Sequence, residues 1–483
     1  MTFFPPALKF NVGIIQGYGQ LWRLLCKPSS ALSYHHKLNA RAFGPDFQWG
    51  VALAAAQNEG AFNVDGRGLS IWDTFSRRSG KIKGGGKPSE ACDFYYRYKD
   101  DLMLVKALGF KVFRFSISWS RILPEGVGRV NKEGIAFYHR LIDECLQLGL
   151  TPYVTLYHWD LPQELQKNGG WTSHQMLKWF TRFATVCAEE YGDKVKNWIV
   201  LNEPMGFTSL GYALGMHAPG KTGLNNFLPA VHNAALCQAE GGRILRTLVP
   251  KANIGTSFSC SEVMPYSQRE EDILAAKRMD AMLNRLFIEP AMGRGYPEVE
   301  NFPLLDKLQI HNKAWRYTER MKFNFDFIGV QNYFALTVKY NALIPYIHAS
   351  EVKAATRKVP HTDMGWEINA DSFYRMIKRF WLYGGVKELI ISEGGAFFKD
   401  ELINGVVNDT KRIDYFEQYI AAMLRAKKEG VNVNGYFAWT LTDNFEWSEG
   451  YAARFGLIHI DFKTQLRTIK NSGYWFRDFL KSF

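Results

Sequence analysis

Eight short apolar runs, separated by helix-like stretches, constrain the fold of this 483-residue chain more than any other feature of its sequence. The runs are rich in β-branched and aromatic residues, as parallel strands buried on both faces are. They lie at 47–53, 111–116, 151–157, 198–201, 253–258, 325–330, 389–391 and 433–439. Eight strands that alternate with helices predict an α/β fold, a single (β/α)8 TIM barrel with loop insertions.

Three of the helix-like stretches end where the sequence supplies a glycine. The stretches 101–108, 132–148 and 411–429 stop at Gly109, Gly149 and Gly430. A glycine just past a helical pattern is a C-cap signal, because glycine adopts the left-handed conformation that ends many helices. No linker rich in Pro, Gly or Ser follows residue 45, so residues 43–483 are predicted to form one domain.

The first 42 residues differ from the rest in charge. Residues 1–45 carry five Lys and Arg and no acid, whereas the remainder carries 54 basic and 47 acidic residues. Apolar residues fall at helical spacing within 12–26, and Pro28 then breaks the pattern. Residues 1–42 are therefore predicted to be a basic N-terminal extension, partly helical or disordered. A targeting segment and a membrane-surface helix at 12–26 are the alternatives, and membrane contact is not favoured.

The composition limits the classes of protein to which the chain can belong. Hydrophobic residues make up 47% and charged residues 22%, a balance typical of a globular protein. Six Cys exclude a disulfide scaffold and favour a reducing compartment, so a cytoplasmic location is expected. The net charge is +12, but no block of Lys and Arg stands out after the extension, so no nucleic-acid partner is expected. The sequence leaves the oligomeric state open.

Two carboxylates directly follow buried strands, at the end of the predicted barrel where such folds carry their chemistry. Glu203 follows the run 198–201 after one residue, and Glu393 follows the run 389–391 in the same way. Glycosidic cleavage needs two carboxyl groups that face each other across a pocket. One protonates the leaving oxygen, and the other attacks the anomeric carbon or activates a water molecule. The two residues are therefore a candidate catalytic pair.

Other strand ends carry side chains suited to sugars. Groups able to hydrogen-bond hydroxyls are Gln57, His158, Asn202 and Glu446. Flat apolar faces on which a pyranose ring can stack are Trp119, Trp159, Trp439 and Trp447. Tryptophan beside a polar group at several strand ends favours a sugar site over simple core packing.

With these residues in view, the chain resembles the β-glucosidases of glycoside hydrolase family one from residue 47 almost to its C-terminus. The matching motifs are AQNEG at 56–60, RGLSIWD at 67–73, FRFSISW at 113–119, YHWDLP at 157–162, NEP at 202–204, TDMGW at 362–366 and WTLTDNFEW at 439–447. So many matches in one order are highly specific.

The resemblance implies a role for each candidate residue. Glu203 would be the general acid/base and Glu393 the nucleophile, with Arg114 and Tyr333 holding Glu393 ionised and aimed. Asn202 would contact the 2-hydroxyl of the sugar. The substrate-binding side chains would be Gln57, His158, Trp159, Asn202, Tyr333, Trp439, Glu446 and Trp447. Family members retain anomeric configuration, which predicts carboxyl groups about 5–5.5 Å apart. No metal or cofactor is implied.

The implied function is a retaining exo-β-glycosidase that releases terminal β-D-glucosyl residues from small β-glucosides or oligosaccharides, with galactosyl and fucosyl residues as further glycones. Glu446 would repel a 6-phosphate dianion, so an unphosphorylated sugar is expected. A transglycosidase on the same site and a non-catalytic carbohydrate-binding protein are the alternatives.

Four positions depart from the family pattern. Gly394 stands where the family usually has Asn, which is expected to remove a hydrogen-bonding side chain and to alter activity modestly. Ala56 stands where an aromatic residue or Ser is frequent, which is expected to enlarge the local space. Gln331 and Asn332 replace the commoner Asn and Tyr, so Tyr333 is aligned with the catalytic tyrosine of the family and the contact beside it is left open.

Overall fold

The structure is a computed structural model that describes residues 38–313 and 316–481. The predicted helix at 12–26, and all of the N-terminal extension up to residue 37, lie outside the described residues. Among the helices of the described ranges, none is long and apolar enough to cross a membrane.

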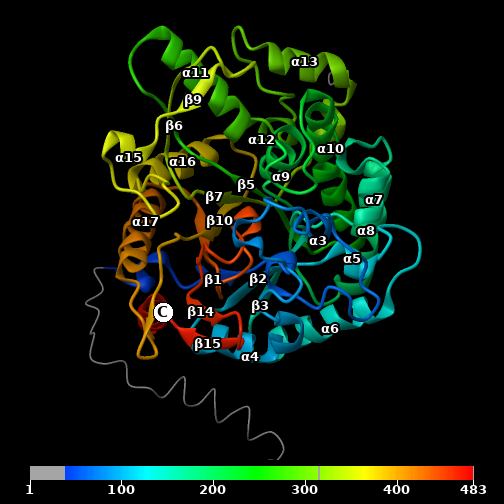
Figure 1. Ribbon diagram of the computed structural model, residues 1–483, viewed down its shortest axis with the longest axis vertical. Coiled ribbons are helices and arrows are strands. Elements are labelled where there is room, and N and C mark those ends of the chain that lie inside the picture. Colours follow the sequence, from blue (N-terminus) through cyan, green and yellow to red (C-terminus); the bar gives the residue numbers. More distant parts are fainter. Residues whose placement is uncertain (1–37, 314–315, 482–483) are drawn as a thin grey trace, which may run out of the picture. The chain divides into compact units, whose positions relative to one another are not determined.

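Eight parallel strands close into a barrel and confirm all eight predicted runs. In chain order they are β1 (Gln48–Ala52), β2 (Val112–Ser116), β3 (Thr151–Tyr157), β4 (Asn197–Asn202), β5 (Asn253–Ser259), β7 (Phe327–Gln331), β10 (Glu388–Gly394) and β13 (Val433–Trp439). Neighbours in sequence are neighbours in space, and β1 pairs with β13, at Gln48 opposite Gly435, to close the ring. The barrel strands lie in the middle of Figure 1, with the long helices around them.

The helices fall between the strands, as the alternating pattern predicts. The α-helices are α2 (Ala55–Asn58), α3 (Ile71–Phe75), α4 (Phe94–Ala107), α5 (Trp119–Ile122), α6 (Lys132–Gln147), α7 (Gln163–Lys167), α8 (Met176–Tyr191), α9 (Pro204–Thr208), α10 (Leu224–Leu248), α11 (Glu270–Asp280), α12 (Ile288–Ala291), α13 (Pro303–Asn312), α14 (Thr318–Met321), α15 (Ala354–Arg357), α16 (Ala370–Leu382), α17 (Thr410–Lys428) and α18 (Asn471–Leu480). Shorter turns are η2 (Ala40–Phe43), η3 (Lys83–Gly85), η4 (Gly170–Thr172) and η8 (Trp447–Glu449), and two π-helices are η5 (Ser209–Ala213) and η6 (Ala281–Arg285).

Aromatic rings fill the inside of the barrel. The Tyr153 ring lies 5.0 Å from the Phe437 ring and 5.9 Å from the Phe327 ring, between centroids. Glycines on neighbouring strands leave room for them, since a Cβ at Gly50 would lie 2.6 Å from Phe437 and one at Gly255 would lie 2.4 Å from Phe327. Large and small residues therefore alternate around the barrel, so its interior is a packed core and the open space lies at its end.

The loop insertions form small sheets of their own. A three-stranded sheet joins β6 (Val263–Pro265), β8 (Leu336–Tyr340) and β9 (Ala349–Glu351). Two hairpins pair β11 (Leu402–Ile403) with β12 (Val406–Val407), and β14 (Ile458–Asp461) with β15 (Leu466–Ile469). In Figure 1, β6, β9 and α11 lie at the upper left of the view, away from the hairpin β14–β15.

Candidate active site

A cavity of about 480 Å³ lies at the carboxyl ends of the barrel strands. Eight of the predicted site residues line it, namely His158, Trp159, Glu203, Tyr333, Glu393, Trp439, Glu446 and Trp447. The other three, Gln57, Arg114 and Asn202, are almost completely buried and hydrogen-bond the lining residues Glu446, Glu393 and His158. The structure therefore brings the whole predicted set together.

Glu393, on β10, is held by charged and neutral donors at both oxygens. Arg114 Nη1 lies 2.5 Å from Glu393 Oε1 and also donates to the Ser392 carbonyl oxygen at 2.8 Å. The Tyr333 hydroxyl donates to Glu393 Oε2 at 2.7 Å. Burial raises the pKa of Glu393, and the Arg114 charge, the Tyr333 hydroxyl and the Gln331 amide oppose that rise. These donors favour the carboxylate form, which is the form that can attack a carbon atom.

Glu203 follows β4 in a different environment. Its hydrogen-bond partners are neutral groups, among them the Asn202 amide at 3.4 Å and the Ser259 hydroxyl. Burial, and then the negative charge of Glu393, raises the pKa of Glu203 to about 8. The surroundings of the two carboxyl groups thus favour different protonation states. Glu203 keeps its proton at neutral pH, whereas Glu393 is stabilised as the anion.

The backbone at three site residues lies in the left-handed region that side chains other than glycine rarely adopt. The φ angle is 76° at Trp159, 44° at Glu203 and 47° at Trp447. Such conformations persist where the surrounding structure enforces them, and they cluster at functional sites. At Glu203 the bend falls between β4 and α9, where Pro204 begins the helix. This bend sets the direction in which the Glu203 side chain leaves the strand.

The tautomer of His158 follows from its hydrogen-bond partners. Arg114 Nη2 donates to Asn202 Oδ1 at 2.6 Å, so the amide nitrogen of Asn202 is the atom that faces His158 Nε2 at 3.1 Å. Burial, and then the Arg114 charge, lowers the pKa of His158, which is therefore neutral. Since Nε2 accepts, the proton lies on Nδ1, a buried atom with no protein partner in the described structure. The Nδ1 proton of His158 is therefore a buried donor that no described protein group accepts.

The segment that follows β13 forms another part of the cavity wall. Gln57 Nε2 donates to Glu446 Oε2 at 3.2 Å, and Gln57 Oε1 is a buried acceptor with no partner among the described residues. Burial, and then the charge of Glu393, raises the pKa of Glu446 to about 8. The Trp159 and Trp447 rings stack with centroids 4.9 Å apart. A sugar binds through hydrogen bonds to its hydroxyl groups and through packing on a flat apolar face. Unsatisfied polar atoms beside indole rings suit both kinds of contact.

Trp119 is the one stacking candidate that lies elsewhere. Its ring is completely buried and stacks on Phe183 at 4.5 Å, and its Nε1 donates to the Gly126 carbonyl oxygen. Trp119 therefore belongs to the packing between α5 and α8, and the expectation that it offers a face to a sugar is wrong.

The structure adds two contacts that the sequence did not reveal and a neighbour for Gly394. Gln331, at the end of β7, donates to Asn202 Oδ1 at 2.8 Å and hydrogen-bonds Glu393, and Ser259, at the end of β5, hydrogen-bonds Glu203. At Gly394 a Cβ would lie 2.6 Å from the Tyr436 hydroxyl. Tyr436 therefore occupies the space that a side chain at position 394 would need.

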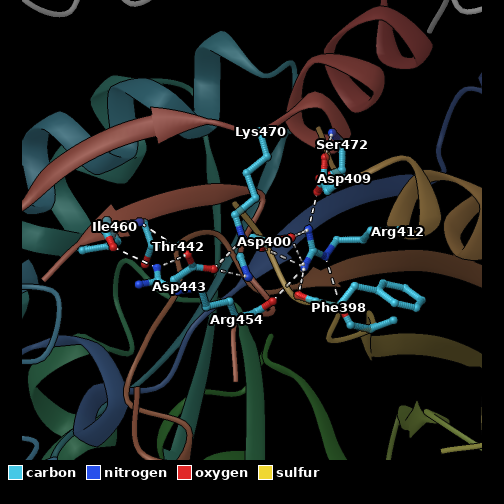
Figure 2. A network of polar contacts seen from close by, with 12 residues as sticks. Phe398, Asp400, Asp409, Arg412, Thr442, Asp443, Arg454, Ile460, Lys470 and Ser472 are labelled. Carbon is cyan, nitrogen blue, oxygen red and sulfur yellow. Dashed lines mark hydrogen bonds and ion pairs between the residues drawn. The ribbon is translucent and has the colours of Figure 1, made fainter. Parts of the chain in front are cut away.

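A network of buried charges supports the two segments that carry the site, and Figure 2 shows it from close by. Lys470 Nζ lies 2.6 Å from Asp443 Oδ1 and also contacts Asp400. Arg412 pairs with Asp400 at 3.0 Å and donates to the Ala396 carbonyl oxygen at 3.0 Å. Asp400 and Ala396 follow the Glu393 strand, and Asp443 precedes Glu446. The network therefore fixes these two segments relative to each other.

A barrel with two carboxyl groups in one pocket, one stabilised as an anion by arginine and one kept protonated, is the arrangement of a glycosidase. The comparison with known proteins is in agreement. The chain belongs to glycosyl hydrolase family 1, whose family model matches residues 39–482.

Individual relatives cover nearly the whole chain. Beta-glucosidase A of Thermotoga maritima is 41% identical over 447 residues, which is 92% of this chain and 99% of the relative. A 6-phospho-beta-galactosidase of Clostridium acetobutylicum is 34% identical over 90% of this chain and 96% of its own length. A solved Thermotoga maritima family 1 glycoside hydrolase, complexed with a cyclophellitol analogue transition state mimic, has a TM-score of 0.88 at 41% identity, covering 92% of this chain and 99% of that one.

Proposed function

We propose that the chain is a retaining exo-β-glycosidase that hydrolyses terminal β-D-glucosyl residues through a covalent glycosyl-enzyme. The observation that carries the assignment of roles is the contrast between the two carboxyl groups. Glu393 is paired with Arg114 at 2.5 Å, whereas the pKa of Glu203 is raised to about 8. The relative named beta-glucosidase A, 41% identical, supports the same activity.

In the first step, Glu393 attacks the anomeric carbon and the bond to the glycosidic oxygen breaks. Glu203 gives its proton to that oxygen, so the aglycone leaves as a neutral alcohol. The covalent sugar removes the negative charge of Glu393, so the pKa of Glu203 falls and Glu203 becomes a base. In the second step Glu203 takes a proton from water, the hydroxyl adds to the anomeric carbon, and Glu393 is released. Two inversions give net retention.

The glycone is proposed to be an unphosphorylated glucosyl residue, with galactosyl and fucosyl residues as further substrates. Glu203, Glu393, Glu446 and Glu449 line the cavity, and its described lining holds no Lys or Arg. A 6-phosphate would lie among carboxyl groups without a cation to pair with it. The free Nδ1 donor of His158 and the free Oε1 acceptor of Gln57 are suited to neutral hydroxyl groups.

The nucleophile is tested with Glu393→Gly and an aryl β-glucoside. We expect hydrolysis to fall by about 10⁴-fold or more, since no covalent intermediate can form. Added azide should restore part of the turnover and yield the α-glucosyl azide, because azide enters from the face that the carboxylate has left. Activity close to that of the parent enzyme would remove Glu393 from this role.

The acid is tested with Glu203→Gln and two leaving groups. A 2,4-dinitrophenyl glucoside needs little protonation, whereas an alkyl glucoside needs a full proton. The variant should therefore retain far more of its activity on the dinitrophenyl substrate. Equal losses on both substrates would contradict the assignment. Aryl β-glucoside, β-galactoside, β-fucoside and 6-phospho-β-glucoside, compared by kcat/KM, then test the glycone.

A further inference from the structure

Two surface segments outside the cavity carry positive charge and no negative charge. The first, residues 74–89, holds five Lys and Arg and no Asp or Glu. The second belongs to residues 204–239, which also lack Asp and Glu and contribute Lys221. Together they expose six cationic side chains, namely Arg77, Arg78, Lys81, Lys83, Lys87 and Lys221. We call these six residues the basic face.

Contacts between the two segments hold the basic face together. Arg78 Nη1 donates to the Pro219 carbonyl oxygen at 3.1 Å, and Lys81 Nζ donates to the Gly215 carbonyl oxygen at 3.5 Å. Both cations also lie 5.7 Å from the centroid of the Phe75 ring. Serine and glycine separate most of these charges along the chain, so it is the fold that concentrates them on one surface.

The basic face lies beside the opening of the active-site cavity. Lys83 Nζ pairs with Glu449 Oε2 at 3.0 Å, and Glu449 lines the cavity. Lys81 contacts the backbone of Gly215, and the next residue, Met216, also lines the cavity. Because Met216 is 57% exposed, this part of the lining is at the opening. The basic face therefore touches the cavity wall at two places.

Exposed apolar side chains lie within the same surface. Leu214 and Met216 flank the Gly215 carbonyl group that Lys81 contacts, and Leu214 is 58% exposed. The backbone of Leu214 pairs with that of Thr222, so the loop that holds both apolar side chains also holds Lys221. Cations beside exposed apolar side chains are typical of surfaces that bind anionic bilayers. The cations attract the headgroups, and the apolar side chains enter the interface.

We propose that the basic face, together with Leu214 and Met216, docks the protein on bilayers that contain anionic lipids, with the opening of the cavity turned toward the lipid surface. A nucleic acid would also attract the cations, but its phosphate backbone offers nothing to the exposed apolar side chains. The inference goes beyond the proposed function, since docking requires neither Glu203 nor Glu393 and is measured without turnover.

The test is sedimentation of the full chain with vesicles of phosphatidylcholine alone or of phosphatidylcholine and phosphatidylserine in equal parts. We expect binding to the mixed vesicles to be about tenfold or more tighter than to phosphatidylcholine, because only the mixed surface is anionic. The difference should shrink as salt is raised, since the cations are exposed and are screened. Equal binding to both vesicles, or binding to neither, would overturn the inference.

Lys87→Gln/Lys221→Gln locates the docking surface. Each cation near an anionic bilayer contributes about fivefold to binding, so the double variant should bind the mixed vesicles about 10-fold or more weakly. The matched control is Lys251→Gln/Lys428→Gln, which removes the same charge from exposed residues. These two lysines precede β5 and β13, at the end of the barrel away from the cavity. Equal losses in the two variants would overturn the assignment of the face.

Leu214→Ser distinguishes a membrane from a soluble polyanion. It should weaken binding to the mixed vesicles by about 3-fold or more, because the leucine side chain leaves water on docking. Leu382→Ser is the matched control, since Leu382 is 80% exposed at the end of α16, before β10, and should bind as the parent does. Unchanged binding in Leu214→Ser, or tighter binding to double-stranded DNA than to the vesicles at equal salt, would make the face a polyanion site and overturn the inference.

Discussion

At the residue scale, the chemistry depends on how differently two identical side chains are surrounded. Glu393 has an arginine at 2.5 Å, and Glu203 hydrogen-bonds neutral groups. Because both are buried, burial raises both pKa values; the negative charge of Glu393 raises the pKa of Glu203 further, whereas Arg114 and Tyr333 oppose the rise at Glu393. The site thus assigns acid and nucleophile before any substrate arrives.

This difference predicts the alkaline limb of the pH profile. A carboxyl whose pKa is raised to about 8 is protonated below that pH and loses its proton above it. The general acid is therefore present at neutral pH, and kcat/KM for an alkyl glucoside should fall tenfold per pH unit well above 8. A profile that stays flat up to pH 9.5 would contradict the acid role of Glu203.

The cause of that raised pKa can be tested separately. Glu393→Gln removes the second-largest contribution to the pKa of Glu203, after burial, whereas Glu446→Gln removes the smallest of the contributions identified. Carboxyl ¹³C titration should show a clearly larger downward shift of the Glu203 pKa in the first variant than in the second. Equal shifts would mean that Glu393 contributes no more than Glu446 to the raised pKa of Glu203.

Gln331 is the residue-scale contact that the sequence did not reveal. Its amide reaches both Asn202 Oδ1, at 2.8 Å, and Glu393. A hydrogen bond to a charged group contributes about 1.5–3 kcal/mol, so Gln331→Leu should lower kcat by roughly 10- to 100-fold. It should also raise the pKa of Glu393 and so move the acidic limb to higher pH. A stability change without movement of that limb would leave Gln331 a purely structural role.

At the element scale, the strand that holds the nucleophile, β10, lies so close to Tyr436 that no room is left for a side chain at Gly394. The Tyr436 hydroxyl, 2.6 Å from a Cβ at that position, is buried and has no partner among the described residues. Gly394→Ala should cost about 1–3 kcal/mol of unfolding free energy through overpacking. Tyr436→Phe should be nearly neutral or stabilising, since it removes an unpaired hydroxyl.

The double variant completes this comparison. Because the hydroxyl is the nearest atom, Gly394→Ala/Tyr436→Phe should be more stable than the sum of the single changes, by about 0.5 kcal/mol or more in denaturant unfolding. Strict additivity would show that β10 shifts away from Tyr436 and that the close approach does not matter.

The buried charges between elements are a second test at this scale. Lys470 and Asp443 are completely buried, and Lys470→Met leaves Asp443 with Arg454 and Asp400 with Arg412 as the remaining cation for each buried carboxylate, so it should cost about 3–5 kcal/mol. Lys83 pairs with Glu449 at the surface, and its side chain is 65% exposed, so Lys83→Met should change stability by less than about 1 kcal/mol. Similar losses in thermal unfolding would mean that the Lys470 network does not brace the two segments.

The elements also show what sequence patterns can and cannot predict. The barrel strands were predictable because burial on both faces demands a continuous apolar run, as at β3 and β13. The short strands of the insertions, such as β6 and β9, have no such run, because three residues at a surface carry no period. Glu203 and Glu393 follow strands and stand in recognisable motifs. Ser259 and Gln331 contact these two carboxyl groups only because β5 and β7 pair with their neighbours in a particular register. The sequence of one segment alone does not determine that register.

At the scale of the whole molecule, every side chain assigned to the site lies between Gln57 and Trp447, within the barrel. Packing against the barrel begins earlier, because Phe43 is 2% exposed and its ring lies 4.8 Å from the Phe47 ring. Removal of residues 1–37 should therefore leave kcat/KM on an aryl glucoside unchanged.

Removal of residues 1–46 is the matched comparison for that deletion. It takes away Phe43, whose ring also lies 5.0 Å from Trp49 at the start of β1. Burial of such a side chain contributes about 1.5–3 kcal/mol, so the chain that begins at residue 47 should unfold at a lower temperature than the one that begins at residue 38. If the shorter deletion already lowers kcat/KM, the basic extension acts on the active site. If the shorter deletion changes only the location of the protein in the cell, the extension is a targeting segment and the barrel alone is the enzyme.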